Sequence, residues 1–285
     1  MNYFEGYYVK CVGKQGSVAV IFGRQACGRE KSSFIQIITK KNSYSATYKS
    51  AGKISKSKFE ARVDKNFSDK TGLFLDIDTQ DLTVKGNVVF GEFAKIKYGA
   101  MGPFKFLPFM ECRHTVASMK HALTGQITIN GETYDFDGGT GYIEGDRGRS
   151  FPQKYFWSQH NCEERDISVF ASAAVIPYMG LSFTGTVCVI HLNGAEHRFA
   201  TYLGARVKQI DDKKLLIKQG NKKLEIQVLD DKTGLPLFAP MKGGMNRVIE
   251  ESLERTVRYQ FLIGEDVMFD LVSEKASHEY SSLRA

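Results

Sequence analysis

The chain has 285 residues, of which 42% are hydrophobic and 25% are charged, and its formal net charge is +7. A chain of this length can bury a substantial core, either as one large unit or as two domains. The composition is that of a water-soluble globular protein, and no apolar run approaches the roughly 20 residues of a membrane-spanning helix, which excludes a transmembrane protein.

The basic residues gather only weakly, beside turns, at residues 53–58, 213–214 and 222–223. This spacing is typical of solvated hairpin ends, so we expect no nucleic-acid partner. The same lysines are compatible with transient contact with an anionic membrane surface.

The beginning of the chain and its cysteines bear on the compartment. Residues 1–6 are strand-like and lack the basic and apolar regions of a secretory signal, so we expect a cytoplasmic protein. The five cysteines are widely spaced and contain no Cys-x-x-Cys pair. We expect reduced, mostly packed thiols.

Along the chain, apolar residues alternate with polar ones at period two, which is typical of strands with one buried face. Leu73, Leu75 and Ile77 form one such set, and residues 224–228 form another. Residues 99–108 predict a long irregular loop. Helical spacing is confined to residues 246–254, where we expect a short helical turn over residues 243–250 and then a strand.

Turn dipeptides divide the alternating segments. Asn130-Gly131 predicts a hairpin, because both residues accept positive φ, and Asn193-Gly194 predicts another. So many antiparallel strands must protect their edges, as closed barrels and sandwiches do. We expect an all-β fold of two antiparallel barrels or curled sheets with few short helices, divided near residue 160.

Residues 138–152 hold the densest run of glycines and charged side chains. If residues 141–146 form a strand, Tyr142, Glu144 and Asp146 project from one face and glycines from the other. Glycines permit a close backbone approach or a bulge, both common beside functional sites.

Two carboxylates on one strand face cannot both ionise cheaply in an apolar cavity, so one of them is expected to stay protonated and to act as an acid. The alternative is an ion pair of either carboxylate with Arg147 or Arg149 that merely fastens the strand. The sequence leaves both interpretations open.

Other chemistries find little support. No helix follows the glycines at 139–141, so they do not predict a nucleotide site. The histidines lack the compact spacing of a zinc site, and Ser150 lacks the Gly-x-Ser-x-Gly elbow. We expect no metal and no cofactor. Aromatic residues make up 12% of the chain and would suit a hydrophobic ligand with a polar head.

Several segments resemble the tocopherol cyclase-like family. Residues 4–10, Phe-Glu-Gly-Tyr-Tyr-Val-Lys, are similar to the family's Phe-Glu-Gly-Trp-Tyr-x-Lys, and residues 108–114 to its Pro-Phe-Met-Glu-Cys-x-His. Residues 141–152, followed by Trp-Ser-Gln-His-Asn at 157–161, resemble Gly-Tyr-Ile-Glu-Lys-Asp-Trp-Gly-x-x-Phe-Pro with a later Trp and Gln-x-Asn. The resemblance covers nearly the whole chain.

The resemblance implies a double lipocalin-like β-barrel, with an N-terminal barrel over residues 1–160 and a C-terminal barrel over residues 161–285. It also implies acid-catalysed cyclisation (an isomerisation) or hydration of a prenyl-quinol or isoprenoid-like substrate. In the plant enzyme, protonation of a prenyl double bond gives a tertiary cation that the hydroquinone oxygen captures. Such a reaction needs a carboxylic acid in a dry pocket with aromatic walls.

The resemblance also assigns roles to residues. Glu144 is the expected proton donor, and Asp146 tunes or orients it. Tyr142, Gln159 and Asn161 are expected to position the substrate oxygen. The other candidates for substrate binding lie in or beside the matching motifs: Glu5, Tyr7, Glu111, His114, Arg147 and Trp157.

Two positions depart from the family pattern, since Arg147 and Tyr7 stand where tryptophans are usual. A guanidinium beside Glu144 would favour the ionised carboxylate and oppose a proton-donor role. This departure favours the alternative function, a non-catalytic carrier or sensor of a hydrophobic small molecule. The paired carboxylates favour the enzyme.

Overall fold

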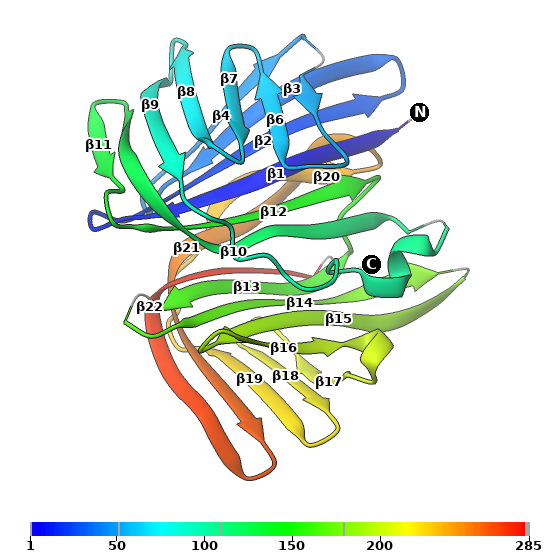
Figure 1. Ribbon diagram of the computed structural model, residues 1–285. Coiled ribbons are helices and arrows are strands. Elements are labelled where there is room, and N and C mark those ends of the chain that lie inside the picture. The colour runs from blue at the N-terminus through cyan, green and yellow to red at the C-terminus, as the bar shows by residue number, and fades with distance from the viewer. Residues whose placement is uncertain (1, 51, 109, 163, 179, 283–285) are drawn as a thin grey trace. The chain divides into compact units, whose positions relative to one another are not determined.

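The computed structural model describes residues 2–50, 52–108, 110–162, 164–178 and 180–282, so Phe109 of the 108–114 motif lies outside the described residues (Figure 1). Strands dominate, and the helical elements of this part of the chain are the short 3-10 turns η1 (Gly102–Phe106) and η2 (Thr201–Leu203). None of its helices has the length and apolarity that crossing a membrane requires. The all-β prediction is confirmed.

The first antiparallel sheet has twelve strands within the described residues, in the order β4-β3-β2-β1-β12-β10-β9-β8-β7-β6-β5, with β11 paired to β10 (Figure 1). Their bounds are β1 Tyr3–Val12, β2 Ser17–Cys27, β3 Glu30–Ile38, β4 Ser43–Tyr48, β5 Lys53–Ile54, β6 Glu60–Val63, β7 Asn66–Asp69, β8 Gly72–Asp78, β9 Thr83–Phe90, β10 Cys112–Ile129, β11 Glu132–Asp135 and β12 Thr140–Gly148. The sheet curls back on itself, because β5 contacts β1 and β2.

The second antiparallel sheet has ten strands in the same described ranges, in the order β16-β15-β14-β13-β22-β21-β19-β18-β17, with β20 paired to β21. Their bounds are β13 Lys154–Cys162, β14 Ile167–Tyr178, β15 Leu181–Leu192, β16 Ala195–Ala200, β17 Arg206–Ile210, β18 Lys214–Gln219, β19 Lys222–Val228, β20 Leu235–Met241, β21 Gly244–Ile263 and β22 Asp266–Ser282. This sheet also curls, since β17 contacts β15.

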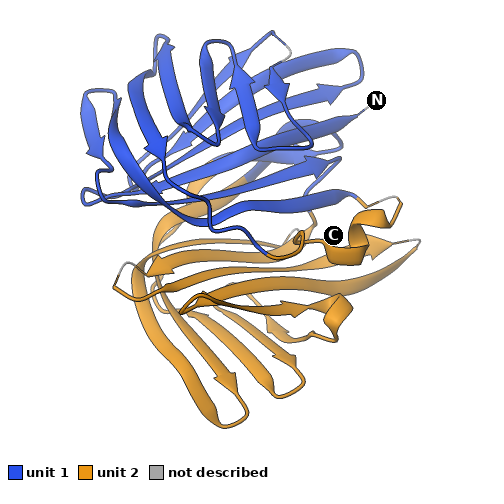
Figure 2. Cartoon of the chain, viewed as in Figure 1, with its two compact units in different colours: residues 1–96, 111–151, 237–248 blue, residues 97–110, 152–236, 249–285 orange. Residues whose placement is uncertain are grey.

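The chain divides into two compact units (Figure 2). Unit 1 comprises residues 1–96, 111–151 and 237–248, and unit 2 comprises residues 97–110, 152–236 and 249–285. Both units are therefore assembled from separate stretches of the sequence. The single predicted boundary near residue 160 stays a prediction.

Each unit has a hydrophobic core built from alternate residues of its strands. Leu73, Leu75 and Ile77 of β8 are buried in the core of unit 1, together with inward residues of β1, β2 and β12. Leu224 and Ile226 of β19 are buried in the core of unit 2. The period-two prediction for both segments is confirmed, and burial of this apolar surface is the main stabilising term for each unit.

The predicted Asn-Gly hairpins are confirmed. Asn130 and Gly131 have φ values of 47° and 85° between β10 and β11, and Asn193 and Gly194 have 49° and 76° between β15 and β16. Two successive positive φ values match the twist of the flanking strands, which is why this dipeptide joins them.

The predicted helical turn over residues 243–250 is wrong, because Gly244–Ile263 is the single long strand β21. Ile249 and Leu253 are four residues apart. This spacing places both on one face of a helix, and it also places both on one face of a strand, because four is a multiple of the strand period of two. The residue between them, Glu251, is buried too and pairs in register with Glu279 of β22. Cross-strand pairing thus decides in favour of the strand.

Candidate functional site

The candidate site is built on β12, which lies between β1 and β10 (Figure 1). Tyr8 of β1 is register-paired with Glu144, and His114 of β10 with Asp146. Directly paired residues of antiparallel strands project to the same side. The three strands therefore place Tyr142, Glu144 and Asp146 on one face together with His114 and Tyr8. We call this surface the His114 face, and the predicted one-sided arrangement is confirmed.

That face is opposite the hydrophobic core of unit 1. Val9 and Cys11 of β1 and Ile143 of β12 alternate with the site residues and belong to the core cluster. Glycines also stand on the core side: a Cβ atom on Gly145 would lie 2.6 Å from the Tyr7 ring. The predicted close approach therefore occurs between the backbone of Gly145 and the ring of Tyr7.

The polar groups of the face meet through His114. Its Nδ1 lies 3.0 Å from Asp146 Oδ1, and its Nε2 lies 3.4 Å from Glu144 Oε2. The Tyr142 hydroxyl donates a hydrogen bond of 2.6 Å to the same Oε2 of Glu144. Glu144 is 7% exposed, so these contacts form in a largely water-excluded setting. One imidazole ring thereby joins both carboxylates.

The electrostatics favour a protonated His114. Burial alone would lower its pKa, but the charges of Asp146 and Glu144 outweigh burial and raise the pKa to about 10. Burial, followed by the Glu144 charge, raises the pKa of Tyr142 well above its ordinary value. At neutral pH the site therefore holds an imidazolium beside Glu144 and Asp146, with a phenol that keeps its proton.

Neither carboxylate is held by Arg147. This side chain projects from the other face of β12, and its guanidinium donates a long hydrogen bond of 3.4 Å to the carbonyl of Lys56. Within the described residues no carboxylate forms an ion pair with Arg147. The alternative of an ion pair with Arg147 is wrong, because alternation along β12 separates it from Glu144 and Asp146.

His114, Glu144 and Asp146 also have their ligand atoms within 4.8 Å of one another, so the described part of the chain holds one group that could bind a metal ion. A metal requires a neutral imidazole, whereas the flanking carboxylates favour imidazolium. The same two carboxylates could also serve as ligands of a cation, and the expectation of no metal stays a prediction.

The tocopherol cyclase-like family model matches residues 42–281. The chain belongs to the tocopherol cyclase-like family. No curated protein sequence matches it.

Solved structures share the fold of this tocopherol cyclase-like chain. CghA with Sch210972 has a TM-score of 0.61 at 8% identity, covering 99% of this chain and 89% of that chain. Kievitone hydratase from Nectria haematococca has a TM-score of 0.54 at 10% identity, covering 99% and 89%. A putative AttH from Nitrosomonas europaea has a TM-score of 0.57 at 12% identity, covering 98% and 91%. The predicted lipocalin-like fold class is confirmed.

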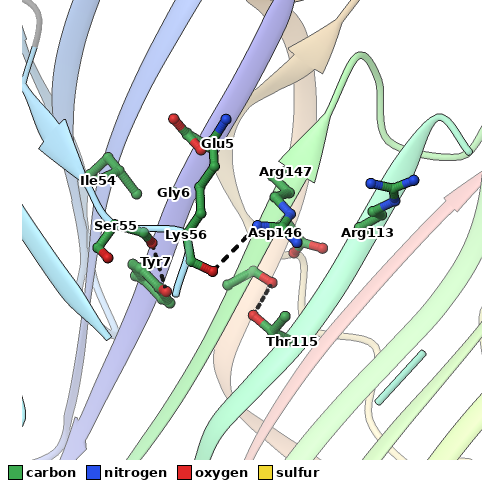
Figure 3. A pocket seen from close by; sticks show the side chains of 11 residues that line it. Glu5, Gly6, Tyr7, Ile54, Ser55, Lys56, Arg113, Thr115, Asp146 and Arg147 are labelled. Carbon is green, nitrogen blue, oxygen red and sulfur yellow. Dashed lines mark hydrogen bonds between the residues drawn. The ribbon is translucent and has the colours of Figure 1, made fainter. Parts of the chain in front are cut away.

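Three of the predicted site residues lie on the core side of the first sheet. Glu5 forms an ion pair with Arg24 of β2, and the Tyr7 hydroxyl donates to the carbonyl of Ser55 at 3.0 Å. Together with Arg147 they line a small pocket (Figure 3). The structure therefore does not bring Glu5, Tyr7 and Arg147 together with Glu144.

The remaining predicted residues lie elsewhere. Glu111 precedes β10, and its carbonyl accepts a hydrogen bond of 2.7 Å from the Arg149 amide. Trp157, Gln159 and Asn161 alternate on β13 in unit 2. There Gln159 Nε2 donates to Asn161 Oδ1 at 3.1 Å. Their roles in binding stay predictions.

The sequence interpretation missed three residues of the His114 face. Tyr8 is paired with Glu144, Lys10 is paired with Tyr142 and almost fully buried, and Cys112 Sγ donates to Asp146 Oδ1 at 3.3 Å. Burial, followed by the Asp146 charge, raises the pKa of Cys112 well above its ordinary value. The alternation in the 4–10 and 108–114 motifs is a signal that could have found them.

Proposed function

We propose that this chain catalyses the cyclisation or hydration of a prenylated, hydrophobic substrate by proton transfer at the His114 face. The observation that carries the proposal is the imidazole of His114 between Glu144 and Asp146, with the Tyr142 phenol on Glu144. Membership of the tocopherol cyclase-like family supports the same reaction class.

The site stores the proton on His114 rather than on Glu144. The charge of the imidazolium and the hydrogen bond from the Tyr142 hydroxyl stabilise the Glu144 carboxylate in the free protein. An apolar substrate over the face removes the water that still reaches it, and a dry site favours the neutral pair of carboxylic acid and imidazole over the ion pair. The proton then moves from His114 Nε2 to Glu144.

Glu144 next delivers this proton to a double bond of the prenyl group, which leaves a tertiary cation on the substrate and a carboxylate on Glu144. The restored carboxylate of Glu144 stabilises the cation together with the carboxylate of Asp146, as do the aromatic rings of Tyr8 and Tyr142. In cyclisation the phenol oxygen of the substrate attacks the cation, and in hydration a water molecule does. The oxygen then loses a proton to Glu144, so no net proton is consumed.

The proposal is tested by incubating the purified chain with a prenylated hydroquinone and analysing the products by mass spectrometry. A ring-closed product has the mass of the substrate, whereas a hydrated product gains the mass of one water. Glu144→Gln removes the proton carrier and should abolish product formation. Glu132→Gln, at an exposed ion pair with Lys41, is the matched control and should convert the substrate normally.

A non-catalytic carrier of the same ligand class is the second candidate. The contacts of His114 join β10 to β12, and such contacts stabilise a sheet whether or not a proton is delivered. A carrier would bind the prenyl compound and release it unchanged, and Glu144→Gln would not affect its affinity. Recovery of unaltered ligand after prolonged incubation with the wild-type chain would favour this function.

A further inference from the structure

Large apolar side chains are exposed together on one side of unit 2, where η1, η2 and the paired ends of β14 and β15 lie (Figure 2). Phe106 of η1 is 78% exposed, Leu181 of β15 is 79% exposed, and Tyr98, just before η1, is 71% exposed. Leu203 of η2 is exposed as well. We call these four residues the η1 patch. Apolar side chains gathered on a surface in this way mark a contact surface.

The η1 patch stands on an ordered base of aromatic rings. The centroid of the Phe104 ring lies 6.2 Å from that of Phe183 and 5.7 Å from that of Tyr202, so η1 packs on β15 and on η2. Leu181 lies two residues before Phe183 on β15 and therefore projects to the same side. Because this base is already fixed, little conformational entropy is lost when the patch is covered.

A buried ion pair supports Tyr98 from behind. Arg198 donates to the Tyr98 carbonyl at 2.8 Å, and its guanidinium carbon lies 5.7 Å from the centroid of the Tyr98 ring. Glu196 forms an ion pair with Arg198 at 3.1 Å, and its side chain is 7% exposed. The carboxylate near the η1 patch is therefore paired and shielded from the surface.

Basic residues surround the η1 patch. The three segments that build it, residues 97–108, 176–186 and 200–206, contain no acidic residue. They contain three basic ones, Lys97, Lys105 and Arg206, and all three are exposed. Lys105 Nζ lies 4.8 Å from the centroid of the Phe106 ring, so charge and ring reach the same level of the surface. An apolar centre with a basic rim complements an anionic lipid surface.

We propose that the η1 patch docks unit 2 on a bilayer surface that carries anionic lipids. The rings and leucines enter the boundary between headgroups and acyl chains, and the basic side chains contact the headgroups. A protein partner fits less well, since lysine is depleted in protein–protein interfaces. The sequence had suggested membrane contact only through other lysines, at residues 53–58, 213–214 and 222–223.

This docking serves either candidate function. A prenylated compound is apolar and therefore partitions from water into a bilayer, where an enzyme or a carrier must collect it. The proposal rests on exposed residues of unit 2 alone, so it does not depend on proton transfer at the His114 face.

The test is sedimentation of the full chain with vesicles of phosphatidylcholine, with and without phosphatidylglycerol. The wild-type chain should sediment with the anionic vesicles and dissociate as sodium chloride is added, because salt screens the basic rim. Phe106→Ser should weaken this partitioning about tenfold or more, since the ring no longer leaves water. Val267→Ser, at an exposed apolar residue beside Glu265 and Asp266, is the matched control and should bind as the wild type does.

The basic rim has its own pair of variants. Lys105→Glu should weaken partitioning about tenfold or more, because one basic residue near an anionic surface contributes about fivefold and the new carboxylate is repelled. Lys31→Glu makes the same change of net charge at an exposed residue of β3 in unit 1 and should have little effect. Circular dichroism verifies that each variant is folded.

Phe106→Trp reports the contact directly. Brominated lipid in the anionic vesicles should quench the new indole, whereas the one tryptophan of the wild type, Trp157, is buried and should keep its emission. Absence of sedimentation with anionic vesicles, or equal sedimentation by folded Phe106→Ser, would overturn the proposal. Self-association that Phe106→Ser abolishes, without vesicle binding by the wild type, would overturn it too, since the patch then contacts a second copy of the chain.

Discussion

His114 Nδ1 lies 3.0 Å from Asp146 Oδ1, at register-paired positions of β10 and β12. The other nitrogen of the same ring reaches Glu144, so the imidazole cannot turn without losing one carboxylate. Asp146 thus orients His114 toward Glu144 and favours its charged form, which is the role of a positioning residue. In the proposed reaction Glu144 keeps its predicted role as proton donor and Asp146 its predicted tuning role, which it exerts through His114.

Removal of the imidazole should stop proton supply without removing the carboxylates. His114→Ala should lower turnover of a prenylated hydroquinone by about 10²-fold to 10⁴-fold, the usual contribution of a general acid. Added imidazole should restore part of the rate, because a small molecule can occupy the vacated space. Equal turnover by His114→Ala and the wild type would contradict a role for this ring, and ligand affinity measured in parallel separates binding from chemistry.

Asp146→Asn should shift the pH dependence of the reaction rather than abolish it. The Asp146 charge is the largest contribution that raises the pKa of His114 against the lowering effect of burial. Without that charge His114 should lose its proton at lower pH, and the alkaline limb of the rate profile should move down by about one unit or more. An unchanged profile with a uniformly lower rate would indicate a merely structural effect of Asp146.

The stability of the chain should depend on pH through His114. Its pKa rises from 6.5 to about 10 on folding, so its contribution is fully present below about pH 6.5 and is lost as the pH rises to 10. Urea unfolding followed by far-ultraviolet circular dichroism should show this decline. His114→Gln should be less stable at neutral pH by roughly 3 kcal/mol, because the largely buried Glu144 and the partly buried Asp146 lose a positively charged neighbour. The difference between the two proteins should shrink toward pH 10.

Tyr142→Phe should affect both stability and rate. The phenol donates to a Glu144 oxygen that is largely buried, and an acceptor left without this donor costs about 1–3 kcal/mol. The carboxylate also becomes easier to protonate, so the variant should retain more activity than His114→Ala. Urea unfolding and steady-state kinetics of the two variants measure these effects.

Gly145→Ala tests the close approach behind the site. The added Cβ atom would lie 2.6 Å from the Tyr7 ring and 2.9 Å from the Gly6 carbonyl, so the β1/β12 pair must shift. We expect a loss of about 1–3 kcal/mol in the free energy of unfolding. Gly99→Ala, where no atom lies within 4 Å of the new methyl, is the matched control and should change stability little.

Local sequence signals were sufficient for much of the fold. Alternation at Leu73, Leu75 and Ile77 and the Asn130-Gly131 turn each depend on neighbouring residues alone, and the structure has both as predicted. The segment at 243–250 failed because spacing by four fits helix and strand equally, and only the pairing of β21 with β22 decides. Such long-range pairing cannot be read from a short stretch of sequence.

The part of the candidate site that lies on a single strand could be predicted from the sequence, and the part that depends on pairing between strands could not. Alternation within one strand placed Tyr142, Glu144 and Asp146 together, because period two is a property of the strand itself. The central position of His114 depends on the register between β10 and β12, which bulges interrupt between Val116 and His121. For the same reason the sequence could not show that Arg147 is register-paired with Arg113 of β10, on the other face.

In the proposed reaction Glu144 passes a proton from His114 to the double bond of a prenyl group. The most direct measurement is the reaction of a prenylated hydroquinone in deuterated water, with the product analysed by mass spectrometry and nuclear magnetic resonance. For the wild-type chain we expect one deuterium on the carbon of the former double bond that does not receive the oxygen, and for Glu144→Gln we expect no product. A labelled product formed equally fast by Glu144→Gln would contradict it.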